Sequence, residues 1–461
     1  MRVKRLRLTD FRNYRELELE LPRGLVLFTG RNAQGKSNVL EAVTLAATSR
    51  SFRTTNDREV VRWGAPGHFA RVEAEFARRA GPLHVDVVVA DAGPPREGTP
   101  TAAPLGPASP DVVAPPQPPA PFRKRIRVNG APRRAMDLLG QATVVVFAPT
   151  DLEIVTGTPA QRRHFLDVTL CQVHPAYCRA LSQMQKVLAQ RAALLRRIKE
   201  GEEDARALGF WDEQLAHFAV PVMRTRAAFL RAAEARAAQV YAELARDEAG
   251  ADVGAASTAA LEDMTAEEIA ALVAAEGDVE GPGAGASASA SASASADADE
   301  GAIAPLRLEY RPSYQGEIAG DLAEAEAGFR ARLLELRRRE LAQGMNVMGP
   351  QRDDLAFLAG EMDLAVYGSR GQQRSAALAL KLAELAYVER ETGDQPILLL
   401  DDVLSELDAQ RRDDLLRAVA ELDQVLLTTT DAATVPEGAR ERATLYAVSA
   451  GHLTRTEAQE T

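Results

Sequence analysis

Residues 25–38 constrain the fold of this chain more than any other stretch. Leu25 to Thr29 form a short apolar run that is typical of a buried strand. The next eight residues, 30–37, match the phosphate-binding loop pattern of Gly, four residues, then Gly-Lys-Ser. Apolar residues at helical spacing follow from Val39. An ordinary glycine turn does not require this strand and helix on either side, so the stretch predicts a nucleotide-binding α/β domain.

Each residue type in the loop has a chemical reason to be there. Gly30 and Gly35 let the backbone curl so that its N–H groups point at an anion, and the helix N-terminus adds partial positive charge. Lys36 is expected to reach the β- and γ-phosphates of ATP, and the Ser37 hydroxyl to hold Mg²⁺. The predicted nucleotide-binding residues of the loop are Gly30, Arg31, Asn32, Ala33, Gln34, Gly35, Lys36 and Ser37.

A second chemical cluster lies near the C-terminus. Residues 396–402 form an apolar strand that ends in Asp401 and Asp402. In a phosphate-loop ATPase, an acid at such a strand end holds Mg²⁺, and the next acid can orient the attacking water. Many strands end in Asp, so this pattern indicates an ATPase site only in combination with the phosphate loop. We therefore expect Asp401 to bind Mg²⁺ with Ser37, and Asp402 to be catalytic.

Residues 367–374 open a helix that is predicted to run to about Glu391, and they contain a Ser-x-Gly-Gln element. This element resembles the signature of ABC-type ATPases, with Ser369, Gly371 and Gln372 as further nucleotide-binding residues. A serine hydroxyl and backbone N–H groups at a helix start form an anion site. In ABC-type ATPases that site caps the γ-phosphate held by the opposite subunit. The resemblance implies an ATP-dependent homodimer.

The net charge of −11 is concentrated in one tract. Residues 251–300 contain 11 of the 66 acidic residues and no Lys or Arg, which leaves 55 acids against 55 Lys and Arg elsewhere. A basic surface for nucleic acid is therefore possible despite the net charge. Arginine clusters at 50–62, 123–134 and 330–339 are the candidates, and exposed charged faces without a partner are the alternative.

Composition and segment lengths favour a cytoplasmic protein without a membrane partner. No apolar run reaches membrane-spanning length, and no apolar signal core follows the basic N-terminus. The two cysteines, Cys171 and Cys178, give no disulfide framework. With His174 they could share a helix face and bind zinc, but Pro175 intervenes and no fourth ligand is evident, which favours core residues.

The chain divides into three predicted parts interrupted by two inserts. Residues 1–150 form the N-terminal part of an ATPase head, and residues 348–461 form its C-terminal part. Residues 151–347 form a helical lobe, with a helical stretch at 210–246 that is expected to break at Pro221. The predicted disordered inserts are a segment with eleven prolines at 91–121 and the acidic, Ser/Ala-rich tract at 251–300.

Six motifs spread over nearly the whole chain resemble those of the bacterial RecF family. They are Phe11–Tyr14, Ser51–Arg53, Pro149–Leu152, Arg162–Asp167, Gly349–Leu355 and Asp401–Asp408. The resemblance implies an α/β fold, a P-loop ABC-type ATPase head with a helical second lobe. It also implies a cytoplasmic, ATP-binding protein that binds single-stranded, gapped and double-stranded DNA. RecF-like proteins act with RecO and RecR to place RecA at single-strand gaps, in recombinational repair, replication restart and SOS induction.

Departures from common ABC heads affect the expected chemistry. Most ABC heads carry Glu after the Mg²⁺-binding Asp, whereas RecF-like proteins and this chain carry Asp, and the shorter side chain of Asp402 predicts weak ATPase activity. No clear lid glutamine follows Phe147, and Thr428–Thr430 stand where many heads have a histidine.

Three alternative functions account for fewer of these features. An SMC-class chromosome-organising ATPase needs a very long heptad arm, and Arg191 interrupts the only heptad here. A transporter ATPase subunit does not explain the RecF-like motifs. A fused nuclease would need more than the roughly fifty residues that follow Asp408.

Overall fold

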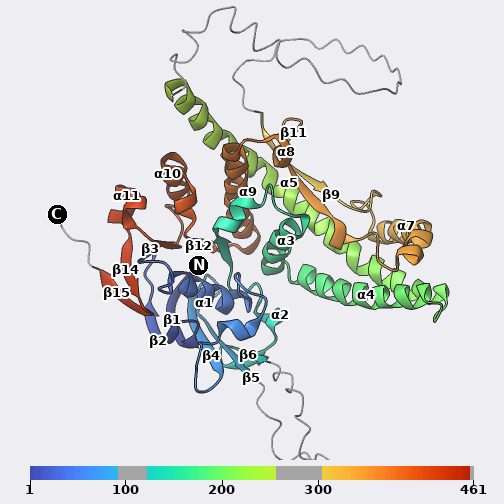
Figure 1. Cartoon of the computed structure of the whole chain (residues 1–461), viewed down its shortest axis with the longest axis horizontal. Helices are drawn as coiled ribbons and strands as arrows, with labels where there is room; N and C mark the ends of the chain where they lie inside the picture. Colours follow the sequence, from blue (N-terminus) through green and yellow to red (C-terminus); the bar gives the residue numbers. More distant parts are fainter. Residues whose placement is uncertain (92–121, 256–303, 457–461) are drawn as a thin grey trace, which may run out of the picture.

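The computed structural model describes residues 1–91, 122–255 and 304–456. Figure 1 shows a head, in which the N-terminal and C-terminal segments lie side by side, and a helical lobe that extends from it. Most of the proline-rich insert, 92–121, and most of the acidic tract, 256–300, lie outside the described residues. Within the described ranges, no helix is both long and apolar enough to cross a lipid bilayer.

The first sheet of the head has six strands in the order β15-β14-β3-β13-β12-β8. All are parallel except β15, which runs antiparallel to β14. The strands are β3 (Gly24–Thr29), β8 (Val144–Phe147), β12 (Ile397–Asp401), β13 (Gln424–Thr429), β14 (Thr444–Ser449) and β15 (His452–Thr456). The central strands are continuous apolar runs, as expected for a parallel sheet that is covered on both faces. The sheet thus joins the predicted phosphate-loop strand and the predicted acidic strand, which are about 370 residues apart in sequence.

The second sheet of the head is antiparallel, in the order β2-β1-β4-β5-β6-β7. Its strands are β1 (Arg2–Phe11), β2 (Tyr14–Glu20), β4 (Phe69–Ala77), β5 (Leu83–Asp91), β6 (Phe122–Val128) and β7 (Ala131–Arg133). Helix α1 (Lys36–Thr48) packs against strands of both sheets, and its Val39, Leu40 and Val43 are fully buried in their shared core. The helix that follows the phosphate loop is therefore held from both sides.

The second lobe combines long helices with a small sheet. Its helices are α3 (Pro159–Val173), α4 (Pro175–Lys199), α5 (Leu208–Ala255) and α7 (Leu322–Gln343), and α5 packs against α9 (Arg370–Thr392). The sheet, in the order β11-β10-β9, consists of β9 (Leu306–Arg311), β10 (Asp354–Ala359) and β11 (Met362–Asp363). It therefore joins strands from both sides of the predicted domain boundary at 347/348. The short helices are α2 (Ala135–Leu138), α8 (Leu364–Tyr367), α10 (Ala409–Ala418) and α11 (Glu437–Glu441).

The predicted helix break at Pro221 is wrong. Helix α5 continues through Pro221 and runs to Ala255, five residues into the acidic tract. A proline inside a helix costs about 3 kcal/mol. The adjacent Val220, Val222 and Met223 are fully buried, and burial of side chains of this size contributes roughly 1.5–3 kcal/mol each. Packing therefore overrides the local preference.

Arg191 interrupts the heptad of α4 because it is the centre of a buried ion cluster. Its guanidinium is fully buried, and it donates to Asp212 (2.9 Å) on α5 and to Glu340 (2.8 and 2.5 Å) on α7. It also donates to the side chain of Asn346 (2.7 Å). Arg337, one of the arginines of the basic α7 cluster, reaches the same Asp212. The arginine thus ties three helices together.

We expect Arg191→Leu to lower the free energy of unfolding by about 3–5 kcal/mol, because it leaves Asp212 and Glu340 buried without their shared cation. Urea unfolding monitored by circular dichroism measures this loss. Arg332→Leu is the matched control, since the Arg332–Glu335 pair on α7 is exposed and should contribute less than about 1 kcal/mol. Equal stability losses in the two variants would contradict the structural role of the buried cluster.

Candidate nucleotide-binding site

The two glycines of the phosphate loop occupy positions that only glycine can fill. Gly30 has φ 147° and Gly35 has φ 116°, both in the region that side chains rarely adopt. A Cβ atom at Gly30 would lie 2.3 Å from the carbonyl oxygen of Val448 on β14. A Cβ atom at Gly35 would lie 2.6 Å from Asn13 and 2.8 Å from Tyr14. The loop is therefore enclosed by neighbouring backbone and side chains.

Two segments far away in sequence fix the shape of the loop. The Tyr14 hydroxyl donates to the carbonyl of Gly35 (2.9 Å), and the Asn13 amide donates to the carbonyl of Gln34 (2.8 Å). From the turn between β14 and β15, the N–H of Ala450 donates to the Gln34 side chain (2.7 Å). Arg31, Asn32 and Ala33 remain exposed at the loop tip. The sequence placed Asn13 and Tyr14 in a family motif but did not reveal this bracing role.

Lys36 lies at the centre of the site and is nearly buried. Its ammonium donates to the carbonyls of Gly30 (2.6 Å) and Arg31 (3.0 Å), so it folds back along the loop. Burial lowers the pKa of Lys36, and the nearby charges of Asp402 and Asp401 oppose that shift. The loop lysine and the two strand-end acids are thus close enough to interact, as their predicted common site requires.

The acids and Thr428 meet at the carboxyl edge of the parallel sheet. Asp401 on β12 is in register with Thr428 on β13, which is in register with Phe28 on β3. The Thr428 hydroxyl donates to Asp401 Oδ1 (2.9 Å) and accepts from the N–H of Asp402 (2.9 Å). Thr428 therefore sets the positions of both acids. The sequence singled it out only as a departure from the usual histidine.

Asp402 has an unsatisfied oxygen in this arrangement. It adopts a left-handed backbone conformation (φ 54°), and its Oδ1 atom is buried without a hydrogen-bond partner among the described residues. Burial raises the pKa of Asp402, and Lys36 partly opposes this while Asp401 and Glu406 add to it. An orphaned buried carboxylate oxygen calls for a donor from outside the protein, and a water molecule beside a bound phosphate can supply one.

The donor set suits Mg²⁺ held jointly with a nucleotide. Mg²⁺ usually keeps several waters and takes one or two protein oxygens together with substrate phosphates. Ser37 is half-buried at the start of α1, and no described residue donates to the Oδ2 atom of Asp401. Across the described ranges, no group of three or more His, Cys, Asp or Glu side chains could hold a metal ion without a bound nucleotide.

A charged network also supports α1. Glu41 is fully buried and accepts from Arg12 (2.8 and 2.6 Å) and from the Ser51 hydroxyl (2.5 Å). Arg53 donates to the side chain of Asn38 (2.7 Å). The first two family motifs, 11–14 and 51–53, therefore serve as braces of the phosphate-loop helix.

The signature residues lie apart from the phosphate loop of their own chain. Ser369 is exposed and caps α9, accepting from the N–H of Gln372 (3.1 Å), while the Gln372 side chain accepts from the N–H of Ser369 (2.9 Å). Figure 1 shows α8 and the start of α9 at the end of that helix away from the head sheet. No hydrogen bond or ion pair among the described residues joins 369–372 to 30–37. The Ser369 hydroxyl keeps its own proton to donate.

Two further family motifs meet in the second lobe. Arg162 on α3 binds both oxygens of Asp354 on β10 (2.7 and 2.9 Å). Asp167 accepts from the fully buried Arg226 of α5 (2.7 Å) and from the Tyr177 hydroxyl (2.5 Å). These contacts join motifs 162–167 and 349–355 into one structural network, away from the nucleotide residues.

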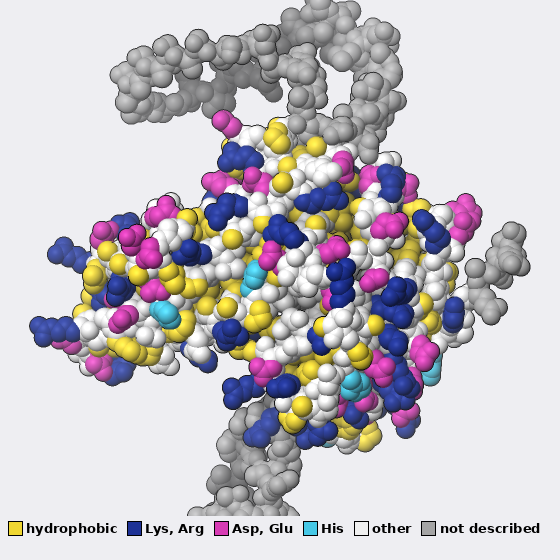
Figure 2. All heavy atoms as spheres, turned by 180° about the vertical axis from the view of Figure 1, so that it is seen from behind, with side chains coloured by type: hydrophobic (Ala, Val, Ile, Leu, Met, Phe, Trp, Pro, Cys, Tyr) yellow, Lys and Arg dark blue, Asp and Glu magenta, His cyan; other side chains and the backbone are white. Residues whose placement is uncertain are grey.

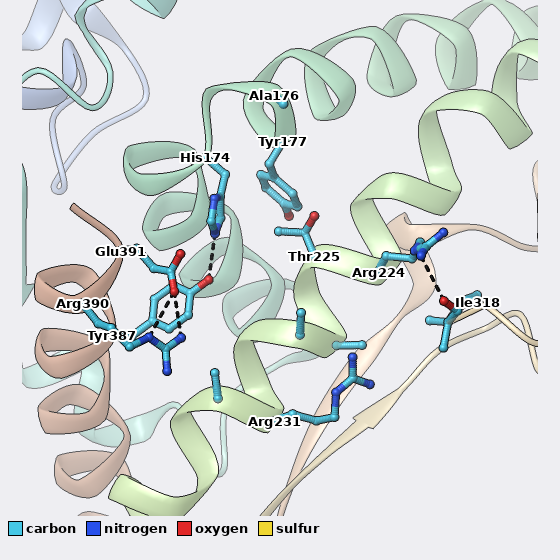
Figure 3. Close-up of a pocket in the computed structure, with 14 residues that line it drawn as sticks. His174, Ala176, Tyr177, Arg224, Thr225, Arg231, Ile318, Tyr387, Arg390 and Glu391 are labelled. Carbon is cyan, nitrogen blue, oxygen red and sulfur yellow. Dashed lines mark hydrogen bonds and ion pairs between the residues drawn. The ribbon is translucent and has the colours of Figure 1, made fainter. Parts of the chain in front are cut away.

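A cavity of about 550 Å³ also lies in the second lobe rather than at the phosphate loop. Figure 3 shows His174 directed at the Tyr387 hydroxyl (2.7 Å), and Arg390 beside Glu391 (2.8 Å). None of the predicted nucleotide-binding residues lines this cavity. It is therefore not part of the candidate nucleotide site.

Comparisons with known proteins agree with this geometry. Residues 5–93 match the family model described as an AAA domain. The chain is 38% identical to the DNA replication and repair protein RecF of Chloroflexus aurantiacus and 37% identical to that of Herpetosiphon aurantiacus, each over 94% of both chains. A solved structure of the recombination mediator protein RecF-ATPrS in the RecFOR pathway has a TM-score of 0.74 and 25% identity, covering 99% of this chain and 98% of that one.

Proposed function

The chain belongs to the RecF family of DNA replication and repair proteins, and from this premise we propose that it is an ATP-dependent DNA-binding protein of recombinational repair. In this role it binds single-stranded, gapped and double-stranded DNA and helps place RecA at single-strand gaps. RecO- and RecR-like proteins are its proposed partners, and replication restart and SOS induction are the processes it serves. The cytoplasmic location expected from the sequence is part of this proposal.

One observation carries the nucleotide part of the proposal. Lys36, Asp401 and Asp402 meet at one sheet edge, beside a loop whose glycines admit no side chain. In the proposed complex the loop N–H groups and Lys36 bind the phosphates of ATP. Ser37 and Asp401 hold Mg²⁺, which would neutralise phosphate charge, and Asp402 orients the attacking water.

The separation of Ser369 from the loop supports a composite site. The exposed hydroxyl of Ser369, with Gly371 and Gln372 behind it, would complete the γ-phosphate site of a second copy. ATP would then join two protomers, whereas ADP lacks the phosphate that bridges them. Hydrolysis in such an arrangement acts as a switch between assembled and free states.

The alternative functions lack comparable support. An SMC-class head carries a very long coiled-coil arm, whereas the long helices of this lobe, α4 with 25 residues and α5 with 48, pack against each other and against α7. A transporter ATPase subunit would not explain the second-lobe network that joins Arg162 and Asp354.

We expect ATP, and not ADP, to double the mass of the protein in multi-angle light scattering. Ser369→Arg should abolish the larger species and leave nucleotide affinity unchanged, because the residue is exposed and remote from its own phosphate loop. The matched control is Ala327→Arg, an exposed residue of α7 on the second lobe. A wild-type mass that does not respond to ATP would refute the composite site.

A further inference from the structure

One of the three basic clusters of the chain, 123–134, contains a row of arginines along a single strand of the head that have no internal counter-charges. Arg123, Arg125 and Arg127 are exposed on β6, and no described carboxylate lies within ion-pair distance of any of them. We call these three residues the arginine ridge. We propose that the arginine ridge is a binding surface for the phosphate backbone of DNA, a proposal that rests on the proposed function and gives it a location.

Several arginines of the other two clusters are used within the protein, whereas Arg330, Arg338 and Arg339 of α7 are exposed and have no ion pair among the described residues. In the 50–62 cluster, Arg62 pairs with Asp10 (2.6 Å) and Arg53 with Asn38 (2.7 Å). In the α7 cluster, Arg337 pairs with Asp212 and Arg332 with Glu335 (2.5 Å). Such arginines would have to break existing contacts before they could bind a phosphate.

Strand register explains why the ridge remains unpaired. Arg123, Arg125 and Arg127 alternate along β6, so they share one face of the sheet and lie opposite Ala90, Val88 and Asp86 on β5. Among these three β5 residues only Asp86 has a carboxylate, and this carboxylate accepts two hydrogen bonds from Arg71 on β4 (2.9 and 3.0 Å). On the same sheet, Arg5 and Arg7 of β1 both pair with Glu18 of β2. Arg5 and Arg7 on β1 and Arg71 on β4 thus have acidic partners, whereas the three arginines of β6 have none among the described residues.

The spacing of the ridge suits a polyanion. Alternate residues of a strand are roughly 6.6 Å apart, which equals about two nucleotides of rise along one strand of duplex DNA. Figure 2 shows Lys and Arg side chains gathered along the lower edge of the head, the part in which Figure 1 places β5 and β6. The arginines would contact the backbone without reading bases, which fits binding that follows DNA structure rather than sequence.

Strand β6 is also tied to the nucleotide helix. Lys124, which points to the opposite face from the ridge, donates to the carbonyl of Ser49 at the end of α1 (2.6 Å) and pairs with Asp57 (2.7 Å). The ridge therefore lies on the same head as the phosphate loop. DNA bound there would lie on the ATPase head rather than on the helical lobe.

The test measures fluorescence anisotropy of the full chain on a gapped duplex with Mg²⁺ and ATP, over a series of salt concentrations. The variant replaces all three ridge arginines by glutamine, Arg123→Gln, Arg125→Gln and Arg127→Gln together. The control, Arg330→Gln with Arg338→Gln and Arg339→Gln, makes the same change in net charge on exposed positions of α7. The expected decrease in the slope of log affinity against log salt is about 2.7 for the ridge variant, at about 0.9 for each phosphate contact.

Each outcome bears on the proposal. A reduced slope in the ridge variant alone, with unchanged ATP affinity, supports it, and each single ridge variant should then give about a third of the loss. Equal slopes for wild type and ridge variant would overturn the ridge while leaving DNA binding by the protein intact. A wild type that binds no DNA with ATP at low salt would overturn both the ridge and the proposed function.

Discussion

Replacement of Lys36 by alanine is expected to weaken ATP binding by about two orders of magnitude, since contacts of roughly 1.5–3 kcal/mol each to charged phosphate oxygens are lost. The Lys36 side chain is nearly buried in the loop. Within residues 30–37 the only other cationic side chain is that of Arg31, which is exposed. Isothermal titration calorimetry with ATP measures the loss. ATP-dependent assembly and DNA binding should disappear with it.

The fold of the Lys36→Ala variant should survive, because the two hydrogen bonds of Lys36 go to partly buried carbonyls of the phosphate loop and not to the core of the head. Lys4→Ala, an exposed residue of β1, is the control and should bind ATP normally. Wild-type affinity in a folded Lys36→Ala protein would remove the lysine from the site.

The same residue predicts a pH dependence. Burial lowers the pKa of Lys36 in the free protein, so the ammonium loses its proton at a lower pH than an exposed lysine does. A bound phosphate favours the charged form and therefore raises that pKa again. ATP affinity should consequently fall as the pH rises through the lowered pKa, and the Lys36→Ala variant should lack this alkaline decline.

Local patterns were sufficient to predict the elements that carry the chemistry. The strand predicted at 25–29 is β3, the strand predicted at 396–402 is β12 (Ile397–Asp401), and Ser369 lies at the start of α9, where a helix start was predicted. These predictions succeeded because strand and helix signals and the glycine spacing are properties of neighbouring residues. The recognition of the RecF family rested on motifs and is confirmed by relatives that cover nearly the whole chain.

Contacts across the fold could not be derived in the same way. The bond from Ala450 to Gln34 joins residues 416 positions apart, and that from Thr428 to Asp401 depends on the register of two parallel strands. The charge of Arg337 indicated a solvated or DNA-binding face, whereas the structure pairs it with Asp212 inside the lobe. Pro221 failed as a helix breaker because buried neighbours stabilise α5. In each case tertiary packing determined the outcome.

Asp402→Asn is expected to slow ATP hydrolysis by about a hundredfold or more, the usual contribution of a residue that handles the proton of the attacking water. The buried, unpartnered Oδ1 atom of Asp402 is the acceptor that such a water needs, and an amide accepts less strongly than a carboxylate. ATP binding should persist, because Lys36, Ser37 and Asp401 are unchanged, and the ATP-bound dimer should accumulate. Phosphate release and light scattering on the same sample measure both effects.

The pH profile separates this role from a merely structural one. Burial raises the pKa of Asp402 above the ordinary value of 3.8, and a protonated carboxyl cannot accept the proton of the water. Wild-type hydrolysis should therefore fall as the pH drops through this raised pKa, and Asp402→Asn should show no acid limb. Glu406→Gln removes a nearby acid that pairs with Arg374 and helps to raise the pKa of Asp402, so it should keep the acid limb and move it to lower pH. Hydrolysis by Asp402→Asn at the wild-type rate would place the water-orienting group elsewhere in the site, with Thr428 as the next residue to test.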